Sequence, residues 1–122
     1  MAAKVSRTPL VAEKDTFVIL TTAGSSREAK HLARLLLKKR CAACINLLPK
    51  IQSWYWWEGK IEHSAETLLL IKTSKQKLGR LAQLLKASHS YAVPELIALP
   101  ISWGDRVYLN WLKKSVQETP DR

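Results

Sequence analysis

The chain has 122 residues, 47% of them hydrophobic, and a formal net charge of +10 at pH 7. The length suits one domain, and the hydrophobic fraction excludes a disordered protein. No apolar run approaches the roughly 20 residues of a membrane span, and residues 1–14 lack the apolar centre of a signal peptide. We therefore expect a soluble, cytoplasmic protein with no membrane partner.

The positive charge suggests nucleic acid, anionic ligands or acidic surfaces as partners. Basic residues gather between residues 27 and 40 and between residues 72 and 86, where Glu28 is the one acidic residue. The simplest interpretation is two solvated helix faces. The alternative is a nucleic-acid-binding ferredoxin-like module that uses this basic surface. The strands lack the aromatic run of RNA-binding domains, which disfavours that alternative.

The polar ends of the chain predict flexible tails at residues 1–14 and 118–122, around a single domain of residues 15–117. The first element of that domain is a short apolar run, residues 17–22, which predicts a strand.

A helix should follow this strand and begin near Ser26. Ser25 and Glu28 have the spacing of a capping box. Apolar residues at helical spacing then form one face and basic residues the other, so we expect an amphipathic helix.

A long hairpin should follow between Cys41 and Thr73. Residues 44–57 are rich in β-branched, aromatic and aliphatic types without helical spacing, which predicts a strand. Pro49 cannot donate to a sheet ladder, so the strand should bend there. Gly59 supplies the positive φ of a tight turn, and the apolar residues after it predict the returning strand.

Ser74 is the predicted cap of a second amphipathic helix, which should end at residues 89–94. Residues 95–101 are apolar on both faces and predict a fourth strand. Asp105 should then cap a final helix that continues to about Val116.

The resulting order is strand, helix, strand, strand, helix, strand and a terminal helix. Right-handed crossovers favour an α+β, ferredoxin-like antiparallel sheet with two helices on one face. Two helices cover only one face of such a sheet, yet three of the four strands read as apolar on both faces. The strands of an antiparallel sheet with one solvent-exposed face should alternate apolar and polar residues. We therefore expect other subunits to cover the second face.

Motifs spread over residues 16–116 resemble the CutA family of divalent-cation-tolerance proteins. The matching residues are Ala42, Ala43, Cys44, Ile45, Asn46, Ser53, Tyr55, Trp57, Glu58, Gly59, Lys60, Ile71, Lys72, Thr73, His89, Tyr91, Val93, Pro94, Glu95, Ile97, Ala98, Leu99, Pro100, Tyr108, Leu109, Asn110 and Trp111.

This resemblance implies a homotrimer similar in build to the PII signalling proteins, with strands of the long hairpins paired across subunits. It also implies a role in tolerance to copper or another divalent cation, with signalling or ligand sensing in the PII manner. It implies no enzymatic activity. The residues themselves show no paired-carboxylate or Ser-His-Asp spacing and no sign of an organic cofactor. A purely structural trimeric scaffold is an equally open interpretation.

The two cysteines form a Cys-x-x-Cys motif that follows a helix and enters a strand. A thioredoxin-like motif instead opens a helix, whose N-terminus stabilises the thiolate, so redox catalysis is disfavoured and both thiols should be reduced. Cysteines three apart in an extended chain also face opposite sides of a sheet. A closed zinc site would need two further ligands, and only His31, His63 and His89 are available.

A copper site that is less complete than a closed zinc site remains an alternative, because thiolate and imidazole ligands both suit copper ions. Cys44 and His89 are the candidate metal ligands, separately or across a subunit interface. The structural alternatives are a small buried core residue for Cys44 and a loop histidine bonded to the backbone for His89.

A cleft for a small anionic or polar ligand is the other candidate site. Tyr91 and Glu95 border the proline loop, and Lys72 leaves the third strand. The family resemblance brings Trp57 and Trp111 near the same intersubunit cleft. Aromatic walls with one lysine and one glutamate suit a ligand site. The alternative is interface packing in which Lys72 and Glu95 neutralise each other.

Overall fold

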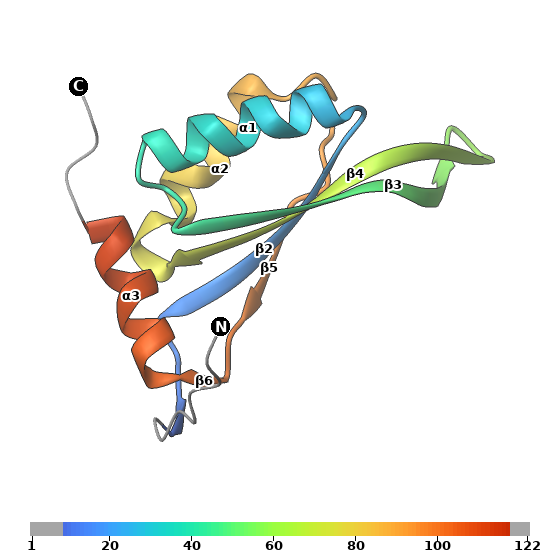
Figure 1. The fold of residues 1–122 in the computed structure, drawn as a ribbon. Helices are drawn as coiled ribbons and strands as arrows, with labels where there is room; N and C mark the ends of the chain where they lie inside the picture. Colours follow the sequence, from blue (N-terminus) through green and yellow to red (C-terminus); the bar gives the residue numbers. More distant parts are fainter. Residues whose placement is uncertain (1–8, 118–122) are drawn as a thin grey trace, which may run out of the picture.

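The computed structural model describes residues 9–117 and has the predicted antiparallel α+β architecture (Figure 1). The main sheet has the strand order β3-β4-β2-β5, and every pairing in it is antiparallel. The elements are β1 (Leu10–Ala12), β2 (Thr16–Ala23), α1 (Ser26–Lys38), β3 (Cys44–Trp57), β4 (Lys60–Ser74), a 3₁₀ turn (Lys75–Lys77), α2 (Leu78–Ser88), β5 (Ile97–Pro100), β6 (Trp103–Asp105) and α3 (Arg106–Gln117).

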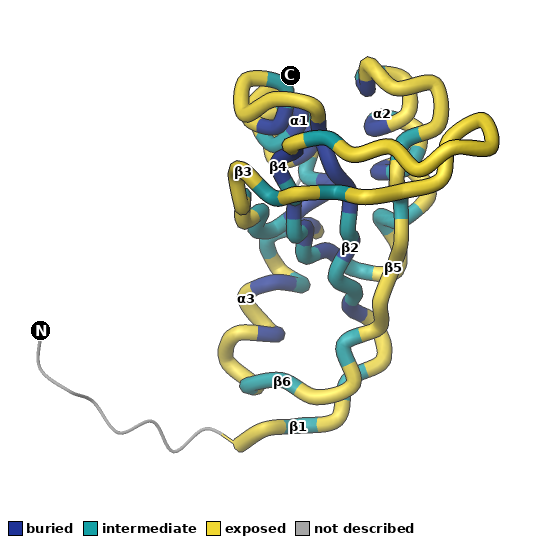
Figure 2. The backbone as a smooth tube through the Cα atoms, turned by 90° about the vertical axis from the view of Figure 1, so that its right-hand side faces the viewer, coloured by how far each residue is buried: buried dark blue, intermediate teal, exposed yellow. Residues whose placement is uncertain are grey.

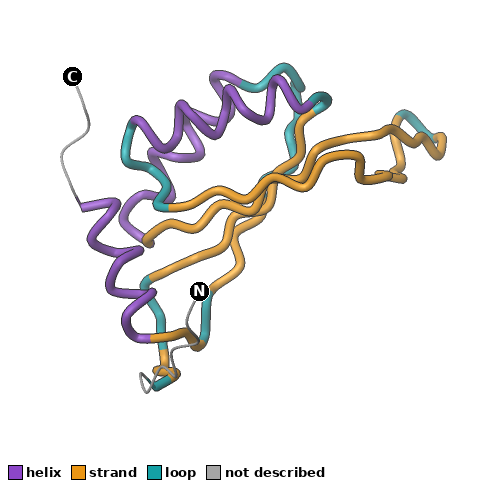
Figure 3. Tube along the Cα trace, in the orientation of Figure 1, coloured by secondary structure: helices purple, strands orange, loops and turns teal. Residues whose placement is uncertain are grey.

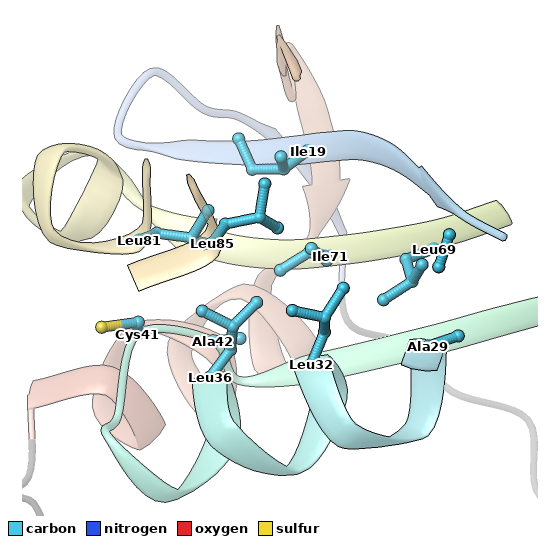
Figure 4. Packing of buried hydrophobic residues seen from close by; sticks show 11 residues of the cluster. Ile19, Ala29, Leu32, Leu36, Cys41, Ala42, Leu69, Ile71, Leu81 and Leu85 are labelled. Carbon is cyan, nitrogen blue, oxygen red and sulfur yellow. The ribbon is translucent and has the colours of Figure 1, made fainter. Parts of the chain in front are cut away.

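Helices α1 and α2 lie side by side on one face of the sheet and bury the core against it (Figure 1). Leu32 and Leu36 on α1 and Leu81 and Leu85 on α2 are fully or almost fully buried, as the helical spacing predicted. They contact the inward side of β2 and β4, where Ile71 is the central residue (Figure 4). Helix α3 packs at the end of the sheet that lies farther from the hairpin turn.

The hairpin of β3 and β4 projects beyond the helices and is exposed over much of its length (Figures 2 and 3). Glu58 and Gly59 form its two-residue turn, with φ values of 50° and 78°. Positive φ at both positions matches the right-handed twist of the strands. The bend predicted at Pro49 is confirmed, because the register of β3 shifts between Leu48 and Ile51.

The face of the sheet opposite α1 and α2 is apolar and only partly covered. Side chains alternate across a strand, so residues that pair with one another share a face. Val18 and Leu20 of β2 lie on this open face with their partners Leu99 and Ile97 of β5. Ile97 and Leu99 are 47% and 46% exposed. The sequence pattern had predicted a second apolar face of this kind.

The helix caps agree only in part with the predictions. Ser25 caps α1 as expected, since its hydroxyl accepts a hydrogen bond from the backbone N–H of Glu28 at 3.1 Å. The prediction that Ser74 caps the second helix was wrong. The 3₁₀ turn Lys75–Lys77 intervenes before α2, and Ser74 makes no side-chain capping bond there.

The tail predicted for residues 1–14 was wrong at β1, which pairs antiparallel with the equally unpredicted β6. Beyond β1, the backbone N–H of Glu13 donates to the carbonyl of Ser102 at 2.8 Å. These three-residue strands form by pairing between the two ends of the domain, so neither has a local pattern of its own. Residues 1–8 and the predicted tail 118–122 lie outside the described part. Within residues 9–117, none of the helices has the length and apolar character that crossing a membrane requires.

Candidate functional site

A cleft of about 650 Å³ lies between the exposed hairpin and the loop that follows α2. We call it the hairpin cleft. Its walls are mostly aromatic and polar. The lining residues are Thr22, Ser53, Trp54, Tyr55, Trp57, Glu66, Tyr91, Ala92, Val93, Pro94 and Glu95.

Tyr91 joins the two walls of the hairpin cleft. Its hydroxyl donates a 2.8 Å hydrogen bond to Oε2 of Glu66, which lies on β4 and is 8% exposed. A Cβ atom added to Gly24 would lie 3.1 Å from this hydroxyl oxygen. The missing side chain at Gly24 therefore lets Tyr91 reach Glu66. Burial and the neighbouring Glu66 carboxylate raise the pKa of Tyr91 well above its usual value, so Tyr91 remains a donor at neutral pH.

Glu28 holds the start of the loop after α2. Its carboxylate accepts hydrogen bonds from the backbone N–H of Ser90 at 2.8 Å and from the Ser90 hydroxyl at 2.9 Å. Burial is the largest influence on the pKa of Glu28 and acts to raise it, but the hydrogen bonds from Ser90 and other neighbours lower it overall. Glu28 is therefore a charged anchor for the loop that carries Tyr91.

His89 is buried, and both of its ring nitrogens are hydrogen-bonded. Nδ1 accepts from the backbone N–H of Tyr91 at 3.0 Å, and Nε2 lies 2.7 Å from the carbonyl oxygen of Thr22. This pattern places the proton on Nε2 and leaves Nδ1 as an acceptor. The ring also packs against Tyr91, with the ring centroids 4.8 Å apart. His89 therefore positions the loop through hydrogen bonds to the backbone, which was the structural alternative to metal binding.

Three of the five predicted cleft residues line the hairpin cleft, namely Trp57, Tyr91 and Glu95. Lys72 does not, because it lies six residues along β4 from Glu66, or about 20 Å in an extended strand. It donates instead to Oδ1 of Asn46.

Trp111 also lies away from the hairpin cleft within one chain. It is on α3, where its ring packs against Tyr108 at a centroid distance of 5.6 Å. Bringing Trp111 to Trp57 would require a second copy of the chain.

The two cysteines differ in burial. Cys41 is fully buried in the core, whereas Cys44 is half-buried and lies beside Tyr108. The structural alternative for Cys44, a buried core residue, therefore suits Cys41 better. Burial raises the pKa of Cys41, which keeps its thiol protonated.

Cys44 and His89 do not meet within one chain. Cys44 pairs with Lys72 of β4, which in turn pairs with Val18 of β2. His89 instead hydrogen-bonds to the carbonyl oxygen of Thr22 on β2. These two β2 residues are four apart, or about 13 Å along an extended strand. No group of three or more His, Cys, Asp or Glu residues that could hold a metal ion occurs within residues 9–117.

Glu66 is the acidic lining residue that was not predicted from the sequence. The ionisable residues of the lining are Glu66, Glu95 and the two tyrosines, and no Lys or Arg from the described part of the chain joins them. Carboxylates and aromatic faces both attract positive charge. The hairpin cleft therefore favours a cation, although the chain as a whole is strongly basic.

Comparisons with known proteins agree on one family. A protein-family model described as CutA1 divalent ion tolerance protein matches residues 17–115. A chloroplastic rice protein named CutA 1 is 45% identical over 104 residues, which are 85% of this chain and 59% of the rice protein. The chain thus spans little more than half of that relative. The divalent-cation tolerance protein CutA of Pectobacterium atrosepticum is 46% identical, with 84% of this chain and 94% of that protein covered.

Solved structures show the same similarity. The divalent cation tolerance protein of Thermus thermophilus superimposes with a TM-score of 0.81 at 41% identity, covering 82% of this chain and 97% of that one. CutA from Synechococcus elongatus in complex with Bis-Tris has a TM-score of 0.81 at 34% identity, covering 88% and 99% of the two chains.

Proposed function

Because this chain belongs to the CutA1 family of divalent ion tolerance proteins, we propose that it acts in divalent-cation tolerance as a homotrimer that binds a small cation in the hairpin cleft. The cation is a hydrated divalent metal ion or a protonated organic amine. The observation that carries this proposal is the acidic and aromatic lining of the cleft in a chain of net charge +10.

The charge of the lining is the first argument. Glu66 is held in place by Tyr91 and faces a cleft walled by Trp54 and Trp57. A cation over a tryptophan face gains about 0.5–1 kcal/mol at exposed sites and more when it is desolvated. An anionic ligand would meet two carboxylates without a compensating lysine, since Lys72 lies elsewhere. We therefore replace the anionic ligand expected from the sequence with a cationic one.

The Synechococcus relative supports the same chemical class. Its structure was solved with Bis-Tris, a small tertiary amine that bears hydroxyl groups. A protonated amine can pair with a carboxylate, and hydroxyl groups can bond polar lining residues such as Ser53. Bis-Tris is therefore a suitable organic probe for this chain.

The open face of the sheet supports the homotrimer. Exposed apolar patches of this kind mark surfaces that other molecules cover. The family resemblance supplies a second copy of the same chain as the cover, and the exposed hairpin as the element that reaches it. A trimer would also bring Trp111 of one protomer towards the hairpin of the next.

Copper at Cys44 and His89 is a narrower proposal, and the donors of one chain do not fit it. Both ring nitrogens of His89 are hydrogen-bonded to the backbone, and the Cys44 thiol lies beside Tyr108. A Cu(II) site at these residues would need donors from a second protomer. The carboxylates of the hairpin cleft suit Mg²⁺, Ca²⁺ or Mn²⁺ better than copper.

Calorimetric titration of the purified protein with CuCl₂, MgCl₂ and Bis-Tris tests the cleft. We expect at least one of these cations to bind, and Glu66→Gln to weaken that binding about tenfold or more, because a hydrogen bond to a charged group contributes about 1.5–3 kcal/mol. Glu62→Gln is the matched control, since Glu62 is an exposed residue of the same strand outside the lining. Binding of a metal salt but not of Bis-Tris identifies the ligand as a metal ion, and the reverse identifies an amine.

The proposal is wrong if none of the three binds, or if the Glu66 and Glu62 variants behave alike. Loss of copper binding in Cys44→Ser, with no effect of Glu66→Gln, would move the metal to the thiol. We propose no catalytic activity. The cytoplasmic location stays a prediction, since the rice relative is named chloroplastic and an Archaeoglobus fulgidus structure is described as periplasmic.

A further inference from the structure

The net positive charge is concentrated on the layer formed by α1 and α2. Residues 27–40 contain six basic residues and one acidic residue, and residues 75–88 contain four basic residues and no acidic one. These two segments therefore carry nine of the ten net charges. Six of these ten cations lie on α1 and α2, which share one face of the sheet, and the other four, Lys39, Arg40, Lys75 and Lys77, lie at the ends of the two helices (Figure 1).

The cations of α1 form one exposed stripe. Spacings of three, four and four residues keep them on the same side of the helix, over about 16 Å of its length. The apolar residues of α1 face the sheet, and the cations are exposed. The stripe consists of Arg27, Lys30, Arg34 and Lys38.

These cations have no acidic partner on their own helix. Glu28 is the only acidic residue of α1, and its carboxylate is bound to Ser90. Among residues 9–117 no stripe cation is ion-paired with another described residue. Helix α2, which packs next to α1, adds exposed Arg80 and Lys86. The stripe therefore has no counter-charge within the described chain.

We propose that the basic face of α1 and α2 binds the phosphate backbone of double-stranded nucleic acid without reading its sequence. A duplex has closely spaced phosphates, and Lys and Arg that neutralise them release condensed counterions. Backbone contacts of this kind position a protein but carry no sequence information. This surface lies on the side of the sheet opposite its open face, so the proposal is independent of the trimer and of the hairpin cleft.

The composition of the two helices selects the duplex over other anionic partners. Neither helix contains Trp, Tyr or Phe, and His31 is their single aromatic residue, so they offer no large aromatic platform on which a single strand could stack its bases or an acidic protein could anchor. Their one exposed large apolar residue is Leu37, at 39% exposure. An amphipathic helix that binds lipid needs a larger apolar surface to insert. A rigid polyanion needs none of these features.

Fluorescence anisotropy with a labelled 24-base-pair DNA duplex tests this proposal across a series of KCl concentrations. We expect a Kd of about 10⁻⁶–10⁻⁴ M near physiological salt, and a log Kd that rises linearly with log[KCl]. Arg34→Glu combined with Lys38→Glu should raise the Kd at least about tenfold and reduce the salt slope by about two, since each lost phosphate contact removes about 0.9. The neutral pair Arg34→Gln and Lys38→Gln should fall between this variant and the original chain.

Lys14→Glu combined with Lys60→Glu is the matched control. It changes the net charge equally and places the change on exposed residues outside the two helices. This control should keep most of the affinity and the salt slope. The proposal is overturned if the duplex does not bind at 25 mM KCl, if the control loses as much affinity, or if only phosphatidylserine vesicles bind.

Discussion

The Tyr91 hydroxyl and the Glu66 carboxylate join the loop after α2 to β4, through a 2.8 Å hydrogen bond across the hairpin cleft. This bond connects residues that are 25 positions apart in the sequence. Glu28 fixes the same loop from α1 through Ser90. The shape of the cleft therefore depends on contacts from two separate elements.

Replacing Tyr91 by Phe should destabilise the fold. The variant keeps the ring but leaves the buried Glu66 carboxylate without this donor, and an unsatisfied buried group costs about 1–3 kcal/mol. A lowered Tm in thermal unfolding checks this expectation. Tyr55→Phe is the control, because the Tyr55 hydroxyl is exposed and lies 3.4 Å from Ser64. Equal Tm values for Tyr91→Phe and the original chain would show that the bond contributes nothing.

The Glu28 anchor should make stability depend on pH in the acid range. Its pKa is lower in the folded than in the unfolded chain, so the unfolded chain binds more protons as Glu28 titrates. The stabilisation is complete above the unfolded value of about 4.3 and is lost as the pH falls through the folded value.

Thermal unfolding of Glu28→Gln and the original chain between pH 7 and pH 3 tests this dependence. We expect the variant to have the lower Tm at pH 7 and the gap to close towards pH 3. Burial raises the pKa of Glu13, but hydrogen bonds from Lys113 and other neighbours lower it overall; Glu13 is present in both proteins, so its effect cancels in the comparison. A gap that stays constant to pH 3 would contradict the role of the ionised carboxylate.

Replacement by alanine should destabilise the fold at Gly104 in β6 and stabilise it at Gly79 in α2. A Cβ atom at Gly104 would lie 2.9–3.0 Å from three side-chain atoms of Leu109, which is almost fully buried. Such overpacking costs about 1–3 kcal/mol. A Cβ atom at Gly79 meets nothing within 4 Å, and alanine in a helix is favoured over glycine by about 0.5–1 kcal/mol. Chemical denaturation of both variants checks the two signs, and a stable Gly104→Ala would show that Leu109 can move aside.

The main elements could be predicted because each has a local cause. The Glu58-Gly59 turn, the bulge after Pro49 and the cap at Ser25 all depend on residues that are adjacent or three apart. Strands β1 and β6 could not be predicted, since they exist only because distant segments pair. Ser74 has the type of a capping residue, but the chain after it turns as a 3₁₀ helix.

The candidate site was predicted in part from a loop and in part from the family resemblance. Tyr91 and Glu95 border the loop that contains Pro94, whereas the resemblance placed Trp57 near the cleft. Glu66 lies within a strand, where an acidic residue suggests solvent, and only the tertiary contact with Tyr91 places it in the cleft. Lys72 shares the face of Glu66 but lies six residues further along β4, beyond the reach of the cleft.

An acidic substitution on the open face of the sheet should break up the proposed homotrimer. Leu99 is 46% exposed and shares this face with Val18. If other protomers cover the face, Leu99→Asp places an unpaired charge in an apolar interface, which is strongly unfavourable. Light scattering of the purified protein at micromolar concentration should then show a trimer for the original chain and a smaller species for the variant. Leu37→Asp is the control, since Leu37 is 39% exposed on the opposite, helical face. A monomeric original chain, or equal dissociation of both variants, would mean that the open face is not the subunit interface.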